Sequence, residues 1–189
     1  MDALELLQTR LSSPSLAGPG PTEAQLEAML RAALRAPDHC CLKPYRFLSI
    51  EGGRRVELGE LFLEATLSDE PDLIEARREK VLAMPLRAPL VLVVIATLCE
   101  HPKVPAVEQR VTAGCAAHAL ELAAAAQGLG AMWRTGSLAY HPRVKAGLGL
   151  GSDEEIIGFL YLGTPANSSK KLPQEDPAAK LDVWQGAER

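Results

Sequence analysis

Trp133 and Arg134 are the residues whose types and setting point first to chemistry. They follow residues 112–127, a stretch that is apolar almost all the way round and rich in alanine. A helix that is apolar on every face cannot lie at a surface, so we expect it to be the buried central helix of the domain. Gly128 and Gly130 would end this helix, because glycine readily adopts left-handed backbone angles. An aromatic ring and a cation beside a glycine turn could form one wall of a cofactor pocket, although a plain core helix and strand would explain the same residues.

The sequence lacks several familiar catalytic patterns. No G-x-G-x-x-G follows the first predicted strand, and the chain contains no G-x-x-x-x-G-K-[ST] and no G-x-S-x-G. The usual Rossmann, P-loop and α/β-hydrolase sites are therefore not expected. His118 and Glu121 are three residues apart on one helical face. We interpret them as a satisfied buried pair rather than as acid–base machinery.

The cysteines do not indicate a disulfide or a metal site. They stand at positions 40, 41, 99 and 115 and form no C-x-x-C. The adjacent Cys40 and Cys41 have poor geometry for a structural disulfide. A metal site built from His39, Cys40, Cys41 and a distant partner would match no zinc-binding spacing. We therefore predict reduced thiols and no bound metal.

Length and composition are those of one globular domain. The chain has 189 residues, 47% of them apolar and 23% charged, and its net charge of −4 gives no electrostatic footprint for nucleic acid. The longest apolar run, residues 89–99, is shorter than the roughly 20 residues of a membrane-spanning helix. Asp2 and Glu5 do not fit a secretory signal. We expect a cytoplasmic protein that binds neither nucleic acid nor a membrane.

The hydrophobic patterns predict how these residues are positioned. Besides the central helix, helices are expected over residues 2–8, 22–35, 54–66, 72–82 and 141–147, and strands over residues 45–51, 90–97, 131–135 and 155–163. Their irregular order predicts a mixed sheet with helices on both faces. Residues 9–21, rich in Ser, Gly and Pro, are expected to form a loop that does more than connect two helices, and residues 36–44 a second such loop. Residues 1–165 would form the single domain, and residues 166–189 would form a tail that either docks or stays mobile.

A set of motifs along the chain resembles the nitroreductase family of FMN-dependent NAD(P)H oxidoreductases, and the short bacterial members most. An early helix is followed by R-x-S at residues 10–12, then by R-A-P-D-H at 35–39 and P-Y-R-F at 44–47. A buried strand comes next, then a helix ending in G-L-G-x-x-W-R at 128–134 and finally G-F-L-Y-L-G-T-P at 158–165. The order and spacing of these motifs, rather than any single one, carry the resemblance, which extends to about Pro165.

The resemblance implies an α+β fold with a mainly antiparallel sheet. It also implies a homodimer that exchanges terminal segments and binds one FMN at each of two interface sites. The residues that match FMN-contacting positions are Arg10, Leu11, Ser12, Arg35, His39, Trp133, Arg134 and Thr135. The segment that matches the nicotinamide-nucleotide position is Ala123, Ala124, Ala125, Ala126, Gln127 and Gly128. No protein nucleophile is needed for hydride transfer, so no catalytic side chain is assigned.

The function that the resemblance implies is a reductase. NADH or NADPH would reduce FMN, which would then reduce a nitroaromatic, quinone or similar small molecule in a ping-pong cycle. Arg10, Ser12 and Arg134 could donate to the FMN phosphate, while Arg35, Lys43 or a protonated His39 could raise the flavin reduction potential.

Two positions depart from the family pattern. Leu11 replaces a phosphate-binding arginine, and Ser15 stands where another arginine is common. One lost charge-assisted hydrogen bond costs roughly 1.5–3 kcal/mol, or about one to two decades in affinity. Lys170 and Lys171 of the tail could compensate. The alternatives are a dimeric binding protein on this fold that binds flavin weakly or not at all, and a related flavin reaction such as dehalogenation.

Overall fold

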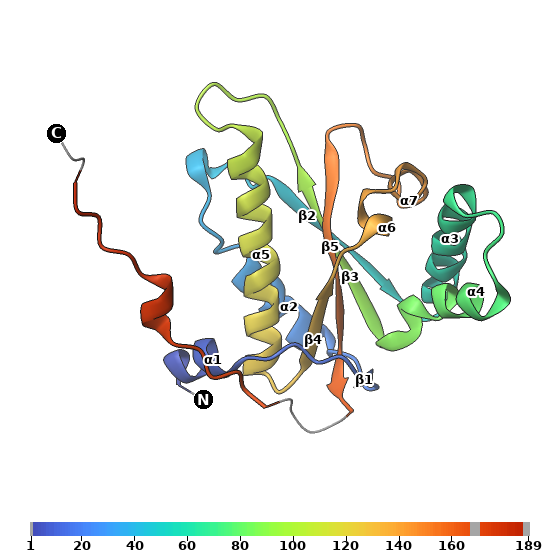
Figure 1. Ribbon diagram of the computed structural model, residues 1–189, viewed down its shortest axis with the longest axis horizontal. Helices are drawn as coiled ribbons and strands as arrows, with labels where there is room; N and C mark the ends of the chain where they lie inside the picture. Colours follow the sequence, from blue (N-terminus) through green and yellow to red (C-terminus); the bar gives the residue numbers. More distant parts are fainter. Residues whose placement is uncertain (1, 167–170, 187–189) are drawn as a thin grey trace.

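The computed structural model describes residues 2–166 and 171–186 of the chain. These residues form a five-stranded sheet in the order β1-β5-β3-β2, with β4 also paired to β5 (Figure 1). Every described strand pairing is antiparallel, so the sheet is not mixed. The strands are β1 (Leu16–Ala17), β2 (Tyr45–Glu51), β3 (Leu90–Thr97), β4 (Gly130–Arg134) and β5 (Glu154–Pro165).

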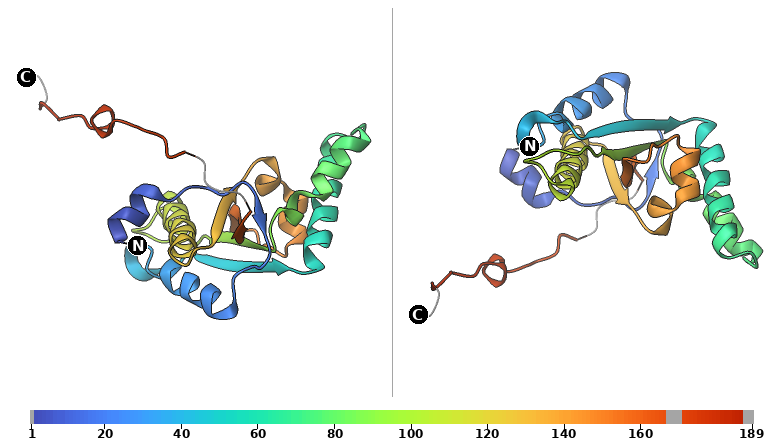
Figure 2. Two further views of the ribbon diagram at one scale, coloured as in Figure 1. Left: turned by 90° about the horizontal axis from the view of Figure 1, so that it is seen from below. Right: turned by 90° about the horizontal axis from the view of Figure 1, so that it is seen from above.

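The helices lie on both faces of the sheet, as predicted, and the α+β class is confirmed. They are α1 (Ala3–Thr9), α2 (Glu23–Ala33), α3 (Arg54–Asp69), α4 (Glu75–Leu82), α5 (Ala106–Ala126), α6 (Ser137–Tyr140) and α7 (Pro142–Gly147). Three short 3-10 turns join them: η1 (His39–Cys41), η2 (Met84–Arg87) and η3 (Pro177–Lys180). Figures 1 and 2 show α2 and α5 on one side of the sheet and α3, α4, α6 and α7 on the other. The sequence patterns missed β1 and α6, which are too short to show a period.

β3 is the centre of the sheet, because its continuous apolar run is buried on both faces. Leu90, Leu92, Val94 and Ala96 face α2 and α5, while Val91, Val93 and Ile95 face α3, α6 and α7. Such alternation between two cores is what a strand covered by helices on each side requires. The register with β5 shifts between Val94 and Ile95, which leaves Ile157 of β5 as an extra residue.

Two local signals at helix ends are confirmed, but Gly130 does not end α5, because it is the first residue of β4 and has no positive φ. Thr22 and Gln25 form the capping box at the start of α2, with the Gln25 N–H donating to Thr22 Oγ1 at 3.2 Å. Gly128 follows α5 with φ of +75°, the left-handed conformation expected at a helix end.

The prediction that the central helix is buried on every face is wrong for the single chain. The sheet and α2 bury one face of α5, including Ala113, Ala117 and Leu120. Within the predicted range His118 and Ala126 are exposed, and on the face of His118 the preceding turns expose Val107 and Val111, 60% each. Burial depends on what packs against a helix, and within one chain nothing described covers this face.

The tail continues beyond β5 and away from the domain (Figures 1 and 2). Residues 171–186 are exposed and contain only the short turn η3. Lys171 is therefore exposed, and Lys170 lies outside the described residues. Among the described helices, none is both long and apolar enough to cross a membrane.

Candidate functional site

A hollow of about 340 Å³ opens where β4 leaves the sheet and turns into α6. We call it the Arg134 hollow. The residues that line it are Phe62, Met84, Arg87, Met132, Trp133, Arg134, Thr135, Gly136, Leu138, Phe159 and Tyr161. Its walls therefore come from α3, η2, β4, β5 and α6, and combine aromatic and sulfur-containing side chains with two arginines.

Arg134 carries the polar chemistry of this hollow. Its guanidinium lies over the ring of Tyr161, 5.7 Å from the ring centroid. Nε of Arg134 is buried and has no hydrogen-bond partner among the described residues. A buried donor left without an acceptor is unusual, because it forfeits its bonds to water. The hollow thus offers a donor to an oxygen-bearing ligand.

A second cation stands at the edge of the same hollow. Arg87 ends η2, is exposed, and forms no ion pair within the part of the chain that the structure describes. Burial raises the pKa of Tyr161, and both arginines oppose that rise. Their effect on Tyr161 indicates a positive potential at the hollow, which would favour an anionic or electron-rich ligand.

Trp133 is held in place by the bulge in β5. Its indole N–H donates to the carbonyl oxygen of Ile157, the extra residue of the bulge, at 3.3 Å. The indole lies directly over Gly158, because a Cβ at that position would stand 2.0 Å from the indole nitrogen. Gly158 is therefore required to leave room for the Trp133 indole, which packs on the α5 face of the sheet, within 3.9 Å of the position of a Cβ on Gly114.

The N-terminal segment runs along β4 and brings Arg10 to the same region. The Ser13 N–H donates to the Ala131 carbonyl at 2.8 Å. Arg10 Nη1 lies 3.5 Å from Oε1 of Glu121, a residue of α5 that is only 4% exposed. The backbone N–H of Trp133 lies near Glu121 and lowers the pKa of this carboxyl. Arg10 and Trp133 thus both neighbour one buried carboxylate.

This arrangement corrects the predicted pairing of His118 with Glu121. His118 is exposed, and the partner of Glu121 is Arg10. Burial raises the pKa of Glu121, while Arg10, His118 and the Trp133 N–H lower it. The helical spacing alone could not reveal this, because the partner comes from the other end of the chain.

Arg35 and His39 do not line the Arg134 hollow. His39 Nδ1 is 2.8 Å from Oε2 of Glu108, in the first turn of α5, and both Arg35 and His39 are exposed. Glu108 and Glu121 are 13 positions apart on one helix, which at 1.5 Å per residue is about 20 Å. One chain therefore carries the predicted flavin contacts as two separate groups.

The comparisons with known proteins agree with this geometry. Residues 16–164 match the family model described as "Nitroreductase family". The chain belongs to the nitroreductase family. This confirms the resemblance found in the motifs, and the predicted oxidoreductase class with it. The protein YdjA of Escherichia coli (strain K12) is 43% identical over 183 residues, which cover 94% of this chain and 97% of YdjA. A relative from Haemophilus influenzae is 37% identical over 172 residues, covering 90% of this chain and 92% of that protein.

Solved nitroreductase structures share the fold. The nitroreductase-like protein from Bacillus cereus superimposes with a TM-score of 0.84 at 23% identity, covering 98% of this chain and 97% of that one. At that identity the similarity is evidence for the fold. It agrees with the antiparallel sheet flanked by helices described above.

The nitroreductase positions at the end of α5 are mostly engaged in packing. Ala124 is buried, and the Gln127 side chain donates to the carbonyls of Gln25 and Ala123. None of the segment Ala123, Ala124, Ala125, Ala126, Gln127 and Gly128 lines the Arg134 hollow. The nucleotide role of this segment remains a prediction, as do the flavin roles of the other residues.

The 36–44 loop of this nitroreductase is strained. Cys40, Cys41 and Lys43 all have positive φ angles, between 49° and 62°. The carboxylate of Asp38 holds the loop by accepting the N–H groups of Leu42 and Lys43. Among the described residues, no three His, Cys, Asp or Glu side chains gather as a metal site would require.

Arg87 and Tyr161 line the Arg134 hollow, and sequence reasoning did not single them out. A weak signal existed for both. Arg87 stands directly before the most apolar strand of the chain, and Tyr161 alternates with Phe159 on one face of β5. Their approach to Arg134 depends on strand pairing, which neither pattern specifies.

Proposed function

We propose that this nitroreductase uses FMN and NADH or NADPH to reduce nitroaromatics, quinones or similar small acceptors. The observation that carries the proposal is Arg134, which lines the hollow over the ring of Tyr161 and whose buried Nε lacks a hydrogen-bond acceptor among the described residues. The relatives support the choice of cofactors. The 43% identical protein bears the name "Putative NAD(P)H nitroreductase YdjA", and an FMN-dependent nitroreductase of this fold from Mycobacterium smegmatis was crystallised with NADPH.

The residues present fit FMN. A flat ring with carbonyl oxygens matches the need of Arg134 for an acceptor and the positive potential from Arg87. Gly136 adopts a φ of +85°, and a Cβ built there meets no atom within 4 Å, so a ring could approach the backbone closely. Ser12 and Arg10 could donate to a phosphate beside β4.

FMN, when bound, supplies the chemistry of accepting a hydride from NAD(P)H and passing electrons to an acceptor. The protein's own residues would hold the ring against the backbone at Gly136 and keep a cation beside its electron-rich edge, which raises the reduction potential. Donor and acceptor would bind in turn over one open face, giving ping-pong kinetics. None of these residues would need to act as a nucleophile.

A homodimer would unite the two groups of predicted flavin contacts. Arg10, Ser12 and Trp133–Thr135 of one protomer would face Arg35 and His39 of its partner. Within one chain the partners of Arg10 and His39, Glu121 and Glu108, are separated by about 20 Å along α5. The exposed face of α5, with Val107 and Val111, would supply the apolar contact between protomers. The tail, which projects from its own domain, would reach the partner subunit.

The absorption spectrum of the purified protein tests the proposal. We expect FMN to be retained after excess is removed, and its bands to bleach when NADH or NADPH is added without oxygen. Arg134→Ala should lower FMN affinity about 10- to 100-fold, the cost of one charge-assisted hydrogen bond. Arg54→Ala is the matched control, because Arg54 pairs with exposed Glu57 at the surface and does not line the hollow. A protein that keeps no FMN, or an Arg134→Ala variant with unchanged affinity, would contradict the proposal.

One observation favours a second candidate function, a dimeric binding protein that holds little or no flavin. Leu11 offers no donor to a phosphate, and the charge of neighbouring Arg10 is partly neutralised by Glu121. A colourless protein with a defined dimer would support this candidate, and the search would turn to other anionic ligands for the Arg134 hollow.

A further inference from the structure

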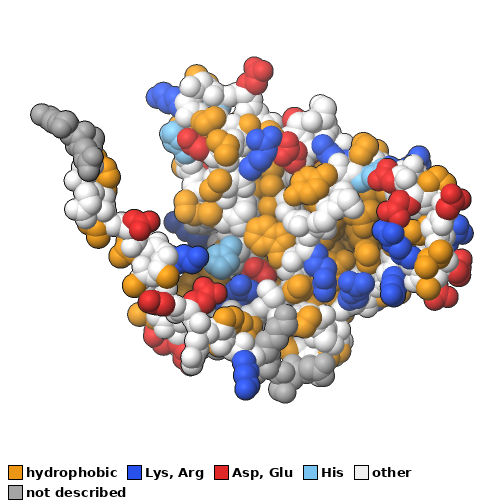
Figure 3. All heavy atoms as spheres, viewed as in Figure 1, with side chains coloured by type: hydrophobic (Ala, Val, Ile, Leu, Met, Phe, Trp, Pro, Cys, Tyr) orange, Lys and Arg blue, Asp and Glu red, His pale blue; other side chains and the backbone are white. Residues whose placement is uncertain are grey.

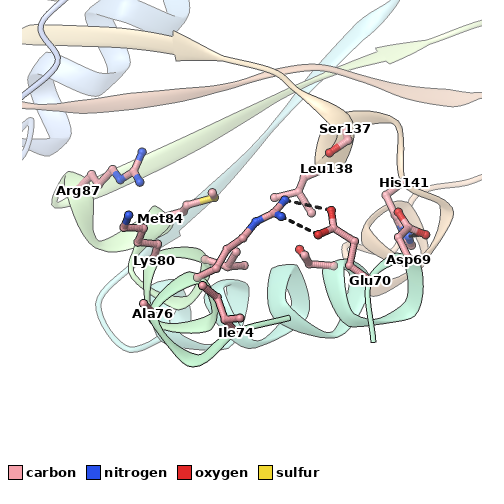
Figure 4. Close-up of a pocket in the computed structure, with 13 residues that line it drawn as sticks. Asp69, Glu70, Ile74, Ala76, Lys80, Met84, Arg87, Ser137, Leu138 and His141 are labelled. Atoms are coloured by element: carbon pink, nitrogen blue, oxygen red, sulfur yellow. Dashed lines mark hydrogen bonds and ion pairs between the residues drawn. The ribbon is translucent and has the colours of Figure 1, made fainter. Parts of the chain in front are cut away.

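A second hollow, of about 500 Å³, opens between α3, α4 and α6 and adjoins the Arg134 hollow. We call it the Lys80 hollow (Figure 4). The two share Met84, Arg87 and Leu138 as lining residues, so a ligand in one can extend into the other. We propose that the Lys80 hollow binds the anionic group of an organic molecule whose body reacts at the Arg134 hollow. This proposal rests on the proposed function and names a substrate class for that site.

The acids of the Lys80 hollow already have partners. Arg77 binds Glu70 through two hydrogen bonds, of 2.6 and 3.0 Å, marked by the dashed lines in Figure 4. Asp69 Oδ1 lies 3.4 Å from His141 Nε2. Paired acids repel an incoming anion less than free ones do, because the neighbouring donor or cation compensates their charge.

The cations that line the Lys80 hollow beside these paired acids have no acidic partner of their own among the described residues. Neither Lys80 nor Arg87 forms an ion pair with any acid in residues 2–166 or 171–186, although both line the hollow. Figure 4 shows both side chains at one end of the hollow, with His141 and Asp69 at the other. Arg87 also lines the Arg134 hollow, so a positive region extends from one hollow into the next. Such a region favours carboxylate, sulfonate or phosphate groups.

The apolar lining of the Lys80 hollow narrows the class of ligand further. Ile74, Val81, Met84 and Leu138 line the Lys80 hollow beside these cations. An apolar pocket with a few charged groups suits a ligand with an organic body and a charged end. An aromatic acceptor that carries a carboxylate or sulfonate meets this description, and so does NADPH with its 2′-phosphate. Their shared chemistry is an anionic substituent on an organic molecule.

The Ser68, His141 and Asp69 side chains do not form a catalytic triad. Ser68 Oγ and Asp69 Oδ1 both approach the same nitrogen of His141, Nε2, at 3.3 and 3.4 Å. Nδ1 accepts the N–H of Arg143 at 3.1 Å, so a neutral His141 carries its proton on Nε2. His141 therefore has no free nitrogen with which to activate Ser68, and the hollow is built for binding.

The test compares matched pairs of molecules that differ by one charged group. We would measure kcat/KM of the flavin-loaded enzyme for NADPH against NADH, and for 4-nitrobenzoate against nitrobenzene. Lys80→Ala should lower the value for at least one charged member about three- to tenfold, the size of one exposed charge contact. The neutral acceptor and NADH should be unaffected. Lys145→Ala on α7 removes the same charge outside the hollow and should change neither ratio.

The two comparisons, NADPH with NADH and 4-nitrobenzoate with nitrobenzene, identify which molecule supplies the anionic group. A change confined to the NADPH/NADH ratio assigns the hollow to the 2′-phosphate, and a change confined to the acceptor ratio assigns it to the acceptor. Unchanged ratios in Lys80→Ala and in the charge-reversed Lys80→Glu, with normal flavin reduction, would overturn this proposal alone. Failure of the proposed function is distinguishable, because the wild type itself would then keep no FMN or show no reduction.

A calorimetric measurement keeps the proposal testable without turnover. The wild type should bind 4-nitrobenzoate more tightly than nitrobenzene, or NADP⁺ more tightly than NAD⁺, and Lys80→Ala should remove most of that difference. Equal affinities in the wild type for both 4-nitrobenzoate and nitrobenzene, together with equal affinities for NADP⁺ and NAD⁺, would overturn the proposal.

Discussion

Arg10 Nη1 lies 3.5 Å from Oε1 of Glu121, and this contact joins the residue that follows α1 to the C-terminal half of α5. The backbone N–H of Trp133 also lies near Glu121 and lowers its pKa, so one buried carboxylate neighbours both a predicted phosphate contact and the strand that lines the Arg134 hollow. The same carboxylate partly neutralises Arg10. Glu121 therefore neighbours both residues, and its charge offsets that of Arg10. Figure 3, viewed as Figure 1, shows basic and hydrophobic side chains side by side on the face where α1 and α5 lie.

The free energy of unfolding of Glu121→Gln, compared with that of the wild type, should increase as pH rises. Burial raises the pKa of Glu121 above its ordinary value of 4.5. The folded protein holds the proton of Glu121 more tightly than the unfolded chain does. The resulting stabilisation is fully present below about pH 4.5 and is lost as pH rises through the pKa of the folded protein. The glutamine side chain of the variant cannot ionise and escapes the loss. Urea unfolding between about pH 4 and pH 8 checks this, and a wild-type advantage that grows with pH would contradict it.

Leu11→Arg should strengthen FMN binding. The substitution restores a donor beside Arg10 and Ser12, and one charge-assisted hydrogen bond is worth about 10- to 100-fold in affinity. Fluorescence titration of the flavin-free protein with FMN would measure the change. Leu7→Arg adds the same charge on the exposed face of α1 and serves as the control. An equal gain in both variants would mean that net charge alone is responsible.

Glu154→Gln should lower the free energy of unfolding at neutral pH by about 1–3 kcal/mol. Glu154 at the start of β5 binds Arg46 of β2 across β3 through two hydrogen bonds, of 2.5 and 2.8 Å. The hydrogen bond from Arg46 lowers the pKa of Glu154 to about 2. The stabilisation is therefore present above the ordinary pKa of 4.5 and is lost as pH falls toward about 2.

Glu57→Gln is the matched control for this measurement. Its partner Arg54 is 76% exposed, and exposed ion pairs contribute little. Chemical denaturation at pH 7 and at about pH 3 should show a loss for Glu154→Gln that shrinks in acid, with almost no effect of Glu57→Gln. A loss that persists unchanged at about pH 3 would mean that the ion pair is not its cause.

Val111→Glu should shift the protein toward monomers and release flavin. Val111 lies on the uncovered face of α5, where the proposed dimer would bury it, and a buried unpaired carboxylate is costly. Sedimentation velocity and flavin content would be measured together. Val56→Glu, at a similarly exposed position on α3, should leave both unchanged. A Val111→Glu dimer with full flavin content would contradict the proposed interface.

Local patterns in the sequence predicted most of the secondary structure. The run of residues 90–97 indicated a buried strand because it is apolar almost throughout and rich in β-branched residues, and Thr22 with Gln25 marked the start of α2. The motif order identified the nitroreductase family, because it reflects backbone requirements such as Gly158 beneath Trp133. Short elements such as β1 and α6 were not predicted, because two to four residues are too few to show a repeating hydrophobic pattern.

Only the tertiary structure decided which residues meet. The pairing of Arg10 with Glu121 joins residues 111 positions apart, and Arg87 approaches Tyr161 through the pairing of β3 with β5. It also decided that α5 is covered on one face only, because burial is a property of neighbours and not of the helix itself. The sequence by itself determined the fold class and the family. The cations left without an acidic partner among the described residues, and the joined hollows for which ligands are proposed, come from side chains brought together by long-range contacts, which no local pattern encodes.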